Sequence, residues 1–253
     1  MTRRSPLMAL PASIRACLFD LDGVLTKTAV VHAAAWKQMF DEYLRSRARH
    51  TGEPFVPFDA TSDYQQYVDG RPRADGTRAF LQGRGISLPE GRPDDAQSAE
   101  TIHGLSNRKS DLVLARIREQ GVQTYPGSVR FVRAAKRAGL RRAVVSSSKN
   151  TREVLEAARI ATLFEVRIDG VTAETSHLTG KPAPDTYLAA ARALGVPPEH
   201  AAVFEDAIAG VEAGRAGGFG LVVGVDRVGH GDELGNHGAD LVVSDLASLL
   251  GKK

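Results

Sequence analysis

Two aspartates one residue apart are the first side chains whose types and spacing suggest chemistry. Asp20 and Asp22 follow a short apolar run and precede Gly23, in the stretch FDLDGVLT at residues 19–26. One carboxylate could attack a phosphate while the other handles a proton, and the aspartyl-phosphate formed would divide phosphoryl transfer into two displacements. Such an attack needs Mg²⁺, because an anion approaches an anionic phosphate. The structural alternative is that both aspartates only cap the turn at Gly23.

Three further polar groups could take part in the same chemistry. Ser146 ends a run of small apolar residues, and hydroxyl and backbone N–H groups at such a point can hold phosphate oxygens. Lys181 stands between a glycine and a proline, which suits a fixed ammonium facing the phosphate. Glu205 and Asp206 are paired carboxylates of the kind that bind Mg²⁺. Each group alone is explained by ordinary helix capping or exposure, but four together favour a phosphoryl-transfer site.

The elements that must position these groups are buried parallel strands, because Asp20, Ser146 and Glu205 each follow a short apolar run. We predict strands at residues 14–19, 143–145, 164–168, 201–204, 221–225 and 241–243. Helices are predicted between them at 129–138, 151–159 and 184–194, with Pro184 at the first helical position. Strands that alternate with helices predict an α/β fold with a doubly wound, Rossmann-like parallel sheet, whose ligands sit at the carboxyl ends of the strands.

Residues from about 34 to 120 interrupt this alternation. They contain helical patterns at 33–43 and 109–120 but no convincing buried strand. We therefore predict a Rossmann-like catalytic core formed by residues 1–33 and 121–253, with an α-helical cap domain inserted at 34–120. The first residues, up to Ile14, are interpreted as a short disordered lead and not as an export signal.

Composition excludes several classes of protein. The 253 residues are 42% hydrophobic and 25% charged, which is ordinary for a globular chain. The formal charge of +3 is spread along the sequence, so we expect no nucleic-acid partner. No apolar stretch approaches the ~20 residues that span a bilayer, so we expect no membrane association. The single cysteine, Cys17, excludes a disulfide scaffold and points to a reducing, cytoplasmic location.

The four groups occur in the order nucleophile, hydroxyl, lysine and acidic pair, and this order resembles that of the haloacid dehalogenase superfamily over nearly the whole chain. Within that superfamily the sequence is similar to the β-phosphoglucomutase family. The narrower resemblance rests on DLDGVLTKTA at 20–29, SSSKN at 146–150, KPAPD at 181–185, and His32, Trp36 and Lys37.

The resemblance implies a role for each of the four groups. Asp20 would be the phosphorylated nucleophile and Asp22 the general acid/base. Ser146 and Lys181 would hold the transferring phosphoryl group. The Mg²⁺ ion would be bound by acidic side chains and the carbonyl of Asp22, the acidic candidates being Asp20, Asp22, Glu205 and Asp206.

The resemblance also implies a set of substrate contacts. An arginine of the cap would grip the distal, non-reacting phosphate, and Arg73 aligns best with it, with Arg71 as the alternative. His32 and Trp36 are four residues apart and face the same side of a helix. A hinge or proton-handling role for His32 stands beside a purely structural one. The remaining contacts would come from Thr28, Ser148, Lys149 and Asn150.

The sequence thus predicts a Mg²⁺-dependent phosphosugar mutase that converts β-D-glucose 1-phosphate to glucose 6-phosphate through an aspartyl-phosphate and a glucose 1,6-bisphosphate. Its partner would be a small sugar phosphate, and we expect a monomer. The main alternative is a sugar-phosphate phosphatase of the same superfamily, in which water discharges the phosphoenzyme. A non-catalytic binding module on the same fold is the alternative from a different class.

Overall fold

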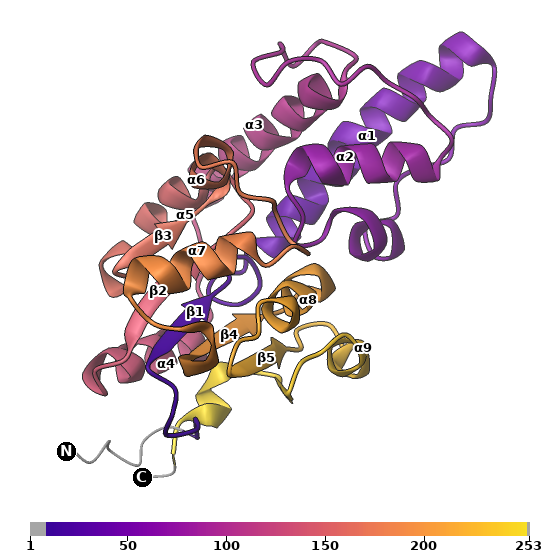
Figure 1. Ribbon diagram of the computed structural model, residues 1–253. Helices are drawn as coiled ribbons and strands as arrows, with labels where there is room; N and C mark the ends of the chain where they lie inside the picture. The colour runs from indigo at the N-terminus through magenta and orange to yellow at the C-terminus, as the bar shows by residue number, and fades with distance from the viewer. Residues whose placement is uncertain (1–8, 252–253) are drawn as a thin grey trace. The chain divides into compact units, whose positions relative to one another are not determined.

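The computed structural model describes residues 9–251, and the chain divides into two compact units (Figure 1). The core unit combines Met1–Lys27 with Val122–Lys253, and the helical unit is Thr28–Gly121. The predicted boundary after residue 33 falls inside a helix that begins at Ala29, so the structure places the division earlier. Residues 1–8 of the predicted disordered lead lie outside the described residues.

The core unit is built on a six-stranded parallel sheet in the order β3-β2-β1-β4-β5-β6. The strands are β1 (Ala16–Phe19), β2 (Arg141–Val145), β3 (Val166–Ile168), β4 (Ala201–Glu205), β5 (Leu221–Val225) and β6 (Leu241–Val243). All six predicted strands are present, which confirms the predicted fold class. Strand β1 lies between β2 and β4 at the centre, with Phe19 in register with Val144 and Phe204.

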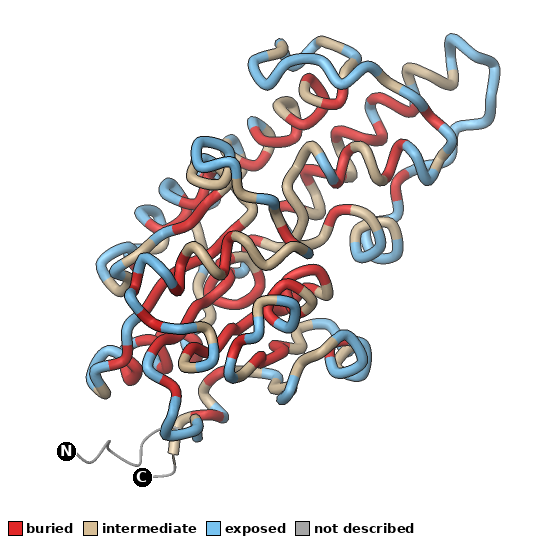
Figure 2. The backbone as a smooth tube through the Cα atoms, in the orientation of Figure 1, coloured by how far each residue is buried: buried red, intermediate tan, exposed pale blue. Residues whose placement is uncertain are grey.

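The central strands β1 and β4 are buried along their whole length, because both faces of the sheet are covered there, whereas the edge strands β3 and β6 are partly exposed (Figure 2). Alternate side chains of β1 point to opposite faces, as the period of two in a strand requires. Leu18 packs in the cluster that contains Tyr187 of α7 (Asp185–Leu194). Phe19 instead stacks on Phe204 with ring centroids 4.7 Å apart and meets Phe131 of α4 (Pro126–Arg137) edge to face. The central strand is therefore fixed by packing on both sides.

The connections between strands are mostly helices, as predicted, with shifted ends. Pro184 precedes α7 as its N-cap and is not its first residue, because the helix begins at Asp185. Helix α4 begins three residues before the predicted start, at Pro126. The other helices of this unit are α5 (Thr151–Ala157), α6 (Gly170–Thr175), α8 (Ile208–Ala216) and α9 (Gly231–Asn236), with single 3₁₀ turns at Ala161–Leu163, Pro198–His200 and Leu246–Leu249.

The helical unit contains helices and no strand within Thr28–Gly121. Its elements are α1 (Ala29–Thr51), a π-helical turn (Tyr64–Val68), α2 (Arg73–Gly83) and α3 (Ile102–Gln120). Its core contains stacked aromatic rings, with Phe40 5.3 Å from Trp36, 5.2 Å from Phe58 and 4.1 Å from Phe80. Helices α1 and α3 are longer than predicted. The last residues of α1, 45–51, are mostly polar and carry no apolar periodicity, whereas α3 begins seven residues earlier than predicted with the buried Ile102. Across residues 9–251, no helix combines the length and apolarity required to cross a membrane.

Candidate active site

The carboxyl ends of the three central strands carry the polar groups singled out in the sequence. Asp20 directly follows β1, Ser146 follows β2, and Glu205 is the last residue of β4. Because β2, β1 and β4 are neighbours and run in parallel, these ends meet at one edge of the sheet. The chain moves from one side of β1 to the other at this edge, which is where open parallel sheets bind their ligands.

Lys181 joins all three of these strand ends through its ammonium group. Its Nζ donates to Asp20 Oδ1 at 2.6 Å, to Glu205 Oε1 at 2.5 Å and to the Val145 carbonyl at 3.2 Å. Its side chain is 1% exposed, so the ammonium is removed from water and all three of its donors are used within the protein. The predicted lysine therefore lies beside the predicted nucleophile.

Glu205 holds this lysine and the start of the next loop. Oε1 accepts from Lys181 and, at 3.0 Å, from the Tyr187 hydroxyl. Oε2 accepts from the backbone N–H groups of Asp206 at 3.0 Å and Ala207 at 3.1 Å. Burial and then the Glu205 charge raise the pKa of Tyr187 well above its ordinary value, so the phenol stays a donor. Both oxygens of Glu205 thus already accept two hydrogen bonds each.

In this cluster the pKa values of both Asp20 and Lys181 are raised. Burial raises the pKa of Asp20 well above its ordinary value, and the carboxylates of Glu205 and Asp22 add to this against the opposing effect of Lys181. Burial alone would lower the pKa of Lys181, but Asp20 and Glu205 outweigh burial and raise it. The lysine therefore stays charged, and a further cation near Asp20 would stabilise the Asp20 carboxylate.

The acidic side chains have the donor chemistry for such a cation. Asp20, Glu205 and Asp206 each offer an oxygen within 4.8 Å of the others. A Cβ on Gly23 would lie 1.6 Å from Asp206 Oδ2, so only glycine allows the loop after Asp22 to approach this carboxylate, and its φ of +88° also favours glycine. Carboxylate oxygens in this arrangement suit a hard divalent metal ion. The cluster could therefore bind such an ion.

The segment after β2 holds the predicted hydroxyl group and its neighbours. Ser146 is 3% exposed, and its Oγ accepts from the Ser148 N–H at 3.1 Å. The Ser148 hydroxyl accepts from the Asn150 N–H at 3.1 Å, and Asn150 is the N-cap of α5. Lys149, a predicted substrate contact, pairs with Glu174 at 2.5 Å on the surface. Ser146 thus lies with Asp20 and Glu205 at the ends of the central strands, whereas Lys149 forms an ion pair with Glu174 on the surface.

The predicted contacts at residues 28–36 belong to the helical unit. Thr28 is the N-cap residue of α1, and His32 and Trp36 lie one turn apart on that helix, all three buried. Lys109 of α3 was not singled out in the sequence. Its Nζ lies 3.0 Å from His32 Nδ1 and 4.6 Å from the centre of the Trp36 ring. In the sequence, the only sign of this contact is that Lys109 lies on the apolar face of a predicted helix. That position does not identify His32 as its partner.

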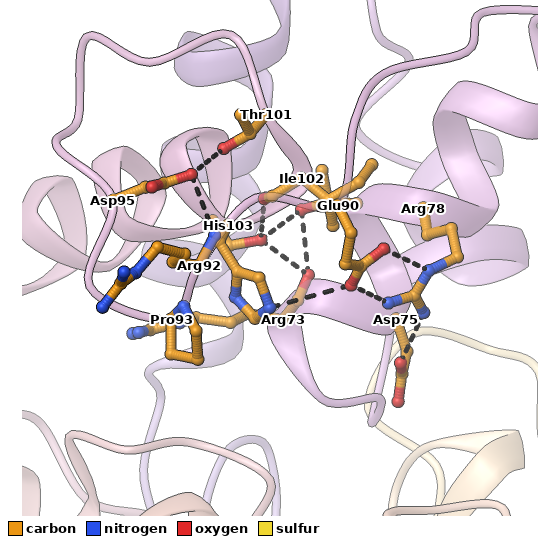
Figure 3. Close-up of polar contacts among 12 residues, drawn as sticks. Arg73, Asp75, Arg78, Glu90, Arg92, Pro93, Asp95, Thr101, Ile102 and His103 are labelled. Carbon is orange, nitrogen blue, oxygen red and sulfur yellow. Dashed lines mark hydrogen bonds and ion pairs between the residues drawn. The ribbon is translucent and has the colours of Figure 1, made fainter.

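Arg73 is the first residue of α2, and a neighbouring helix orients it. Its guanidinium donates to Asn107 Oδ1 of α3 at 2.7 Å. It lines a polar cavity of about 590 Å³ together with Asp95, Asn107 and Asp111. Figure 3 shows Arg73 with the loop that contains Asp95.

Polar contacts hold that loop in shape. Arg78 of α2 pairs with Asp75 at 2.7 Å and with Glu90 at 2.5 Å, and Thr101 donates to Asp95 at 2.6 Å (Figure 3). Arg71, the alternative to Arg73, lies before α2 and is half-buried. Of these two arginines, Arg73 is the one whose guanidinium is held by a side chain of α3, that of Asn107.

Comparisons with known proteins agree with this geometry. Residues 14–218 match the family described as a haloacid dehalogenase-like hydrolase. Proteins named beta-phosphoglucomutase from Mycobacterium bovis and Mycobacterium tuberculosis are 55% identical over 250 residues, covering 98% of this chain and 95% of each relative. The crystal structure of beta-phosphoglucomutase from Clostridium difficile is 25% identical, with a TM-score of 0.73 and 93% of both chains covered.

The chain therefore belongs to the haloacid dehalogenase superfamily and, within it, to the β-phosphoglucomutase family. This confirms the resemblance carried by the residues around Asp20, Ser146 and Lys181.

Proposed function

We propose that this chain is a Mg²⁺-dependent phosphosugar mutase that converts β-D-glucose 1-phosphate to glucose 6-phosphate through an aspartyl-phosphate and glucose 1,6-bisphosphate. The observation that carries the proposal is the buried contact of Lys181 with Asp20 and Glu205, beside the turn that bears Asp22. The likeness to proteins named beta-phosphoglucomutase supports the choice of reaction.

In the first half-reaction a carboxylate oxygen of Asp20 forms a bond to phosphorus while the bond from phosphorus to the sugar oxygen breaks. Asp22 gives its proton to the departing sugar oxygen, because an alkoxide is a poor leaving group without one. In the second half-reaction Asp22 accepts the proton of the sugar hydroxyl that attacks the phosphoryl group on Asp20. The first half-reaction thus consumes glucose 1,6-bisphosphate and releases glucose 6-phosphate, and the second converts β-glucose 1-phosphate to glucose 1,6-bisphosphate and frees Asp20.

Lys181 and Ser146 are the residues we propose to hold the phosphoryl group. The ammonium of Lys181 offsets the repulsion between the Asp20 carboxylate and the phosphate oxygens, and it is already oriented before substrate arrives. Ser146 lies at the end of the neighbouring strand with its hydroxyl buried. Such preorganised donors stabilise charge that develops in the transition state.

We further propose that Mg²⁺ is the metal and that Asp20, Asp206 and the Asp22 carbonyl hold it, with Glu205 as a further candidate. When bound, Mg²⁺ would neutralise charge on the transferring phosphoryl group. Glu205 fits best as the group that orients Lys181, because four donors already occupy its oxygens.

For the substrate, we propose that the helical unit acts as a cap and that Arg73 binds the distal phosphate. A guanidinium suits a phosphate dianion, because its donors pair with two oxygens at once. Thr28, His32 and Trp36 would contact the sugar or its phosphate from the same unit. Ser148, Lys149 and Asn150 would do so from the segment after β2. We expect the protein to work in the cytoplasm as a monomer.

The test is one assay of β-glucose 1-phosphate with Mg²⁺ and a trace of glucose 1,6-bisphosphate, scored for both glucose 6-phosphate and free phosphate. A mutase gives the isomer with little free phosphate, and omission of the bisphosphate delays turnover. Free phosphate as the main product would support the phosphatase alternative. No Mg²⁺-dependent turnover of any phosphate ester would favour a binding module.

A further inference from the structure

The turn that carries Asp22 is stabilised internally but leaves two buried carbonyl groups pointing away from it. Within the turn, the N–H groups of Leu25 and Thr26 donate to the Leu21 carbonyl, and the Gly23 N–H donates to the Thr26 carbonyl. Gly23 and Val24 are buried, so their own carbonyls need donors from elsewhere in the protein.

Arg227, in the loop between β5 and α9, supplies those donors. Its Nε donates to the Gly23 carbonyl at 2.9 Å, and one terminal nitrogen donates to the Val24 carbonyl at 3.3 Å. These carbonyls belong to the first and second residues after Asp22. One planar guanidinium therefore binds two consecutive carbonyls of the turn.

The guanidinium is itself held from several sides. It donates to the Ser244 carbonyl at 2.7 Å, to Asp245 at 3.3 Å and to the Ser128 hydroxyl at 3.2 Å. It also stacks on the Tyr125 ring, 3.6 Å from the ring centre. Its side chain is 12% exposed. Arg227 is therefore a rigid connection between the Asp22 turn and the end of β6.

The loop that carries Arg227 also contacts the second acidic segment. Asp226 folds the loop by accepting from the backbone N–H groups of residues 228–231 at 2.6–3.2 Å. His230 Nε2 lies 3.0 Å from the Asp206 carbonyl, and it must carry the proton there because a carbonyl only accepts. The same short loop thus touches the turn after Asp22 and the residue Asp206.

We propose that Arg227 is a positioning residue that acts through Asp22. It fixes the turn so that the Asp22 carboxyl stands where it can pass a proton to and from the sugar oxygen. This inference rests on the proposed acid/base role of Asp22. Arg227 itself does not touch the reacting atoms, so its removal should impair the steps that need proton transfer and spare those that do not.

Two phosphoryl donors separate these steps. Departure of a sugar oxygen needs an acid, whereas acetate leaves acetyl phosphate without one. With saturating Mg²⁺, we expect Arg227→Ala to lower turnover of β-glucose 1-phosphate by about 10- to 100-fold, the range typical for residues that orient a reacting group. The rate of phosphoenzyme formation from acetyl phosphate in a single turnover should change little. Arg227→Lys keeps the charge but loses the forked donors of the guanidinium, and it is the variant to use if Arg227→Ala does not fold. It should also lower turnover of β-glucose 1-phosphate more than phosphoenzyme formation from acetyl phosphate.

Arg142→Ala is the matched control. Arg142 is also a buried arginine of the core unit that donates to backbone carbonyls, those of Leu140 and Leu163, and it lies at the start of β2, away from the strand ends that carry the site. Its loss should leave the ratio of the two rates unchanged. An equal change of ratio in Arg142→Ala, or equal losses of both rates in the Arg227 variants, would overturn the inference.

Asp22→Asn, measured in parallel, separates this inference from the proposed function. If Asp22→Asn loses sugar-phosphate turnover selectively and the Arg227 variants do not, only the role of Arg227 fails. If Asp22→Asn itself shows no selective loss, the acid/base role of Asp22 fails and the role of Arg227 fails with it.

Discussion

The core unit and the helical unit organise their polar residues by different physical means. In the core unit, Asp20, Ser146 and Glu205 meet because parallel strands end at the same edge of a sheet, and Lys181 reaches them from the loop before α7. In the helical unit, Arg73 contacts Asn107 and His32 contacts Lys109, both of them side chains of α3. The comparison shows that the sheet topology fixes the positions of the polar residues in the core unit. Individual side-chain contacts fix those in the helical unit. Substitutions should therefore have larger effects in the core unit.

The largest expected effect is that of Asp20→Asn, which tests the core side of the comparison. The amide has almost the same shape but is a poor nucleophile, so turnover should fall by about 10⁴-fold or more while the fold is kept. Turnover and circular dichroism measure the two parts of this prediction.

Asp41→Asn is the control in the helical unit, because Asp41 is also a buried aspartate and accepts from the Phe58 N–H at 2.8 Å. It should lower the melting temperature and keep most of the activity. A folded Asp20→Asn variant with normal turnover would remove Asp20 from the site.

Lys181→Ala should have the next largest effect. Without the ammonium, Asp20 repels the phosphate and kcat should fall by about 10²- to 10³-fold. The loss also leaves two buried carboxylates without their cation, which should cost about 3–5 kcal/mol in the free energy of unfolding. Steady-state kinetics and urea unfolding measure the two effects. Full activity in this variant would mean that Lys181 has only a structural role.

Asp20, Ser146 and Glu205 could be predicted from sequence because each lies at the end of a short apolar run, and parallel strand ends coincide. Lys181 follows no such run and was marked only by its place between a glycine and a proline. Arg227 could not be found in this way, because its long side chain reaches a turn more than two hundred positions earlier and nothing near it in sequence marks that contact. Lys109 was missed for a similar reason, since helix periodicity places it on the buried face without naming His32 as its neighbour. The length of α1 was underestimated because its last residues, 45–51, are mostly polar and carry no apolar periodicity.

Arg73→Ala tests the helical side of the comparison and should have an intermediate effect. The distal phosphate of the bisphosphate is gripped in both half-reactions, so mutase turnover should fall more than about tenfold. Acetyl phosphate has no distal phosphate, so its rate of phosphoenzyme formation should be nearly unchanged. The ratio of the two rates is the measurement.

Arg78→Ala is the matched control for this ratio, because Arg78 lies on the same helix and pairs with Asp75 and Glu90. It should leave the ratio unaltered. If Arg73→Ala lowers both rates equally, Arg73 supports the fold in general and Arg71 becomes the better candidate for the distal phosphate.

The smallest expected effect is that of Tyr187→Phe, which sharpens the comparison within the core. The substitution removes one of four donors to Glu205 and leaves Lys181 in place. It should cost about 1 kcal/mol of stability and change kcat only a few-fold. Urea unfolding and steady-state kinetics measure both. A loss of activity as large as that of Lys181→Ala would show that catalysis depends on the Tyr187 hydroxyl as much as on Lys181.

The most direct test of the central claim is to locate the phosphoryl group on the protein. The enzyme is mixed with acetyl phosphate and Mg²⁺, quenched, and treated with borohydride, which reduces an aspartyl-phosphate to homoserine. Peptide mass spectrometry then identifies the converted residue. We predict conversion at Asp20 in the wild-type protein and in Asp22→Asn, and none in Asp20→Asn. Conversion at another residue, or none in the wild-type protein under turnover conditions, would contradict a mechanism in which Asp20 is the nucleophile.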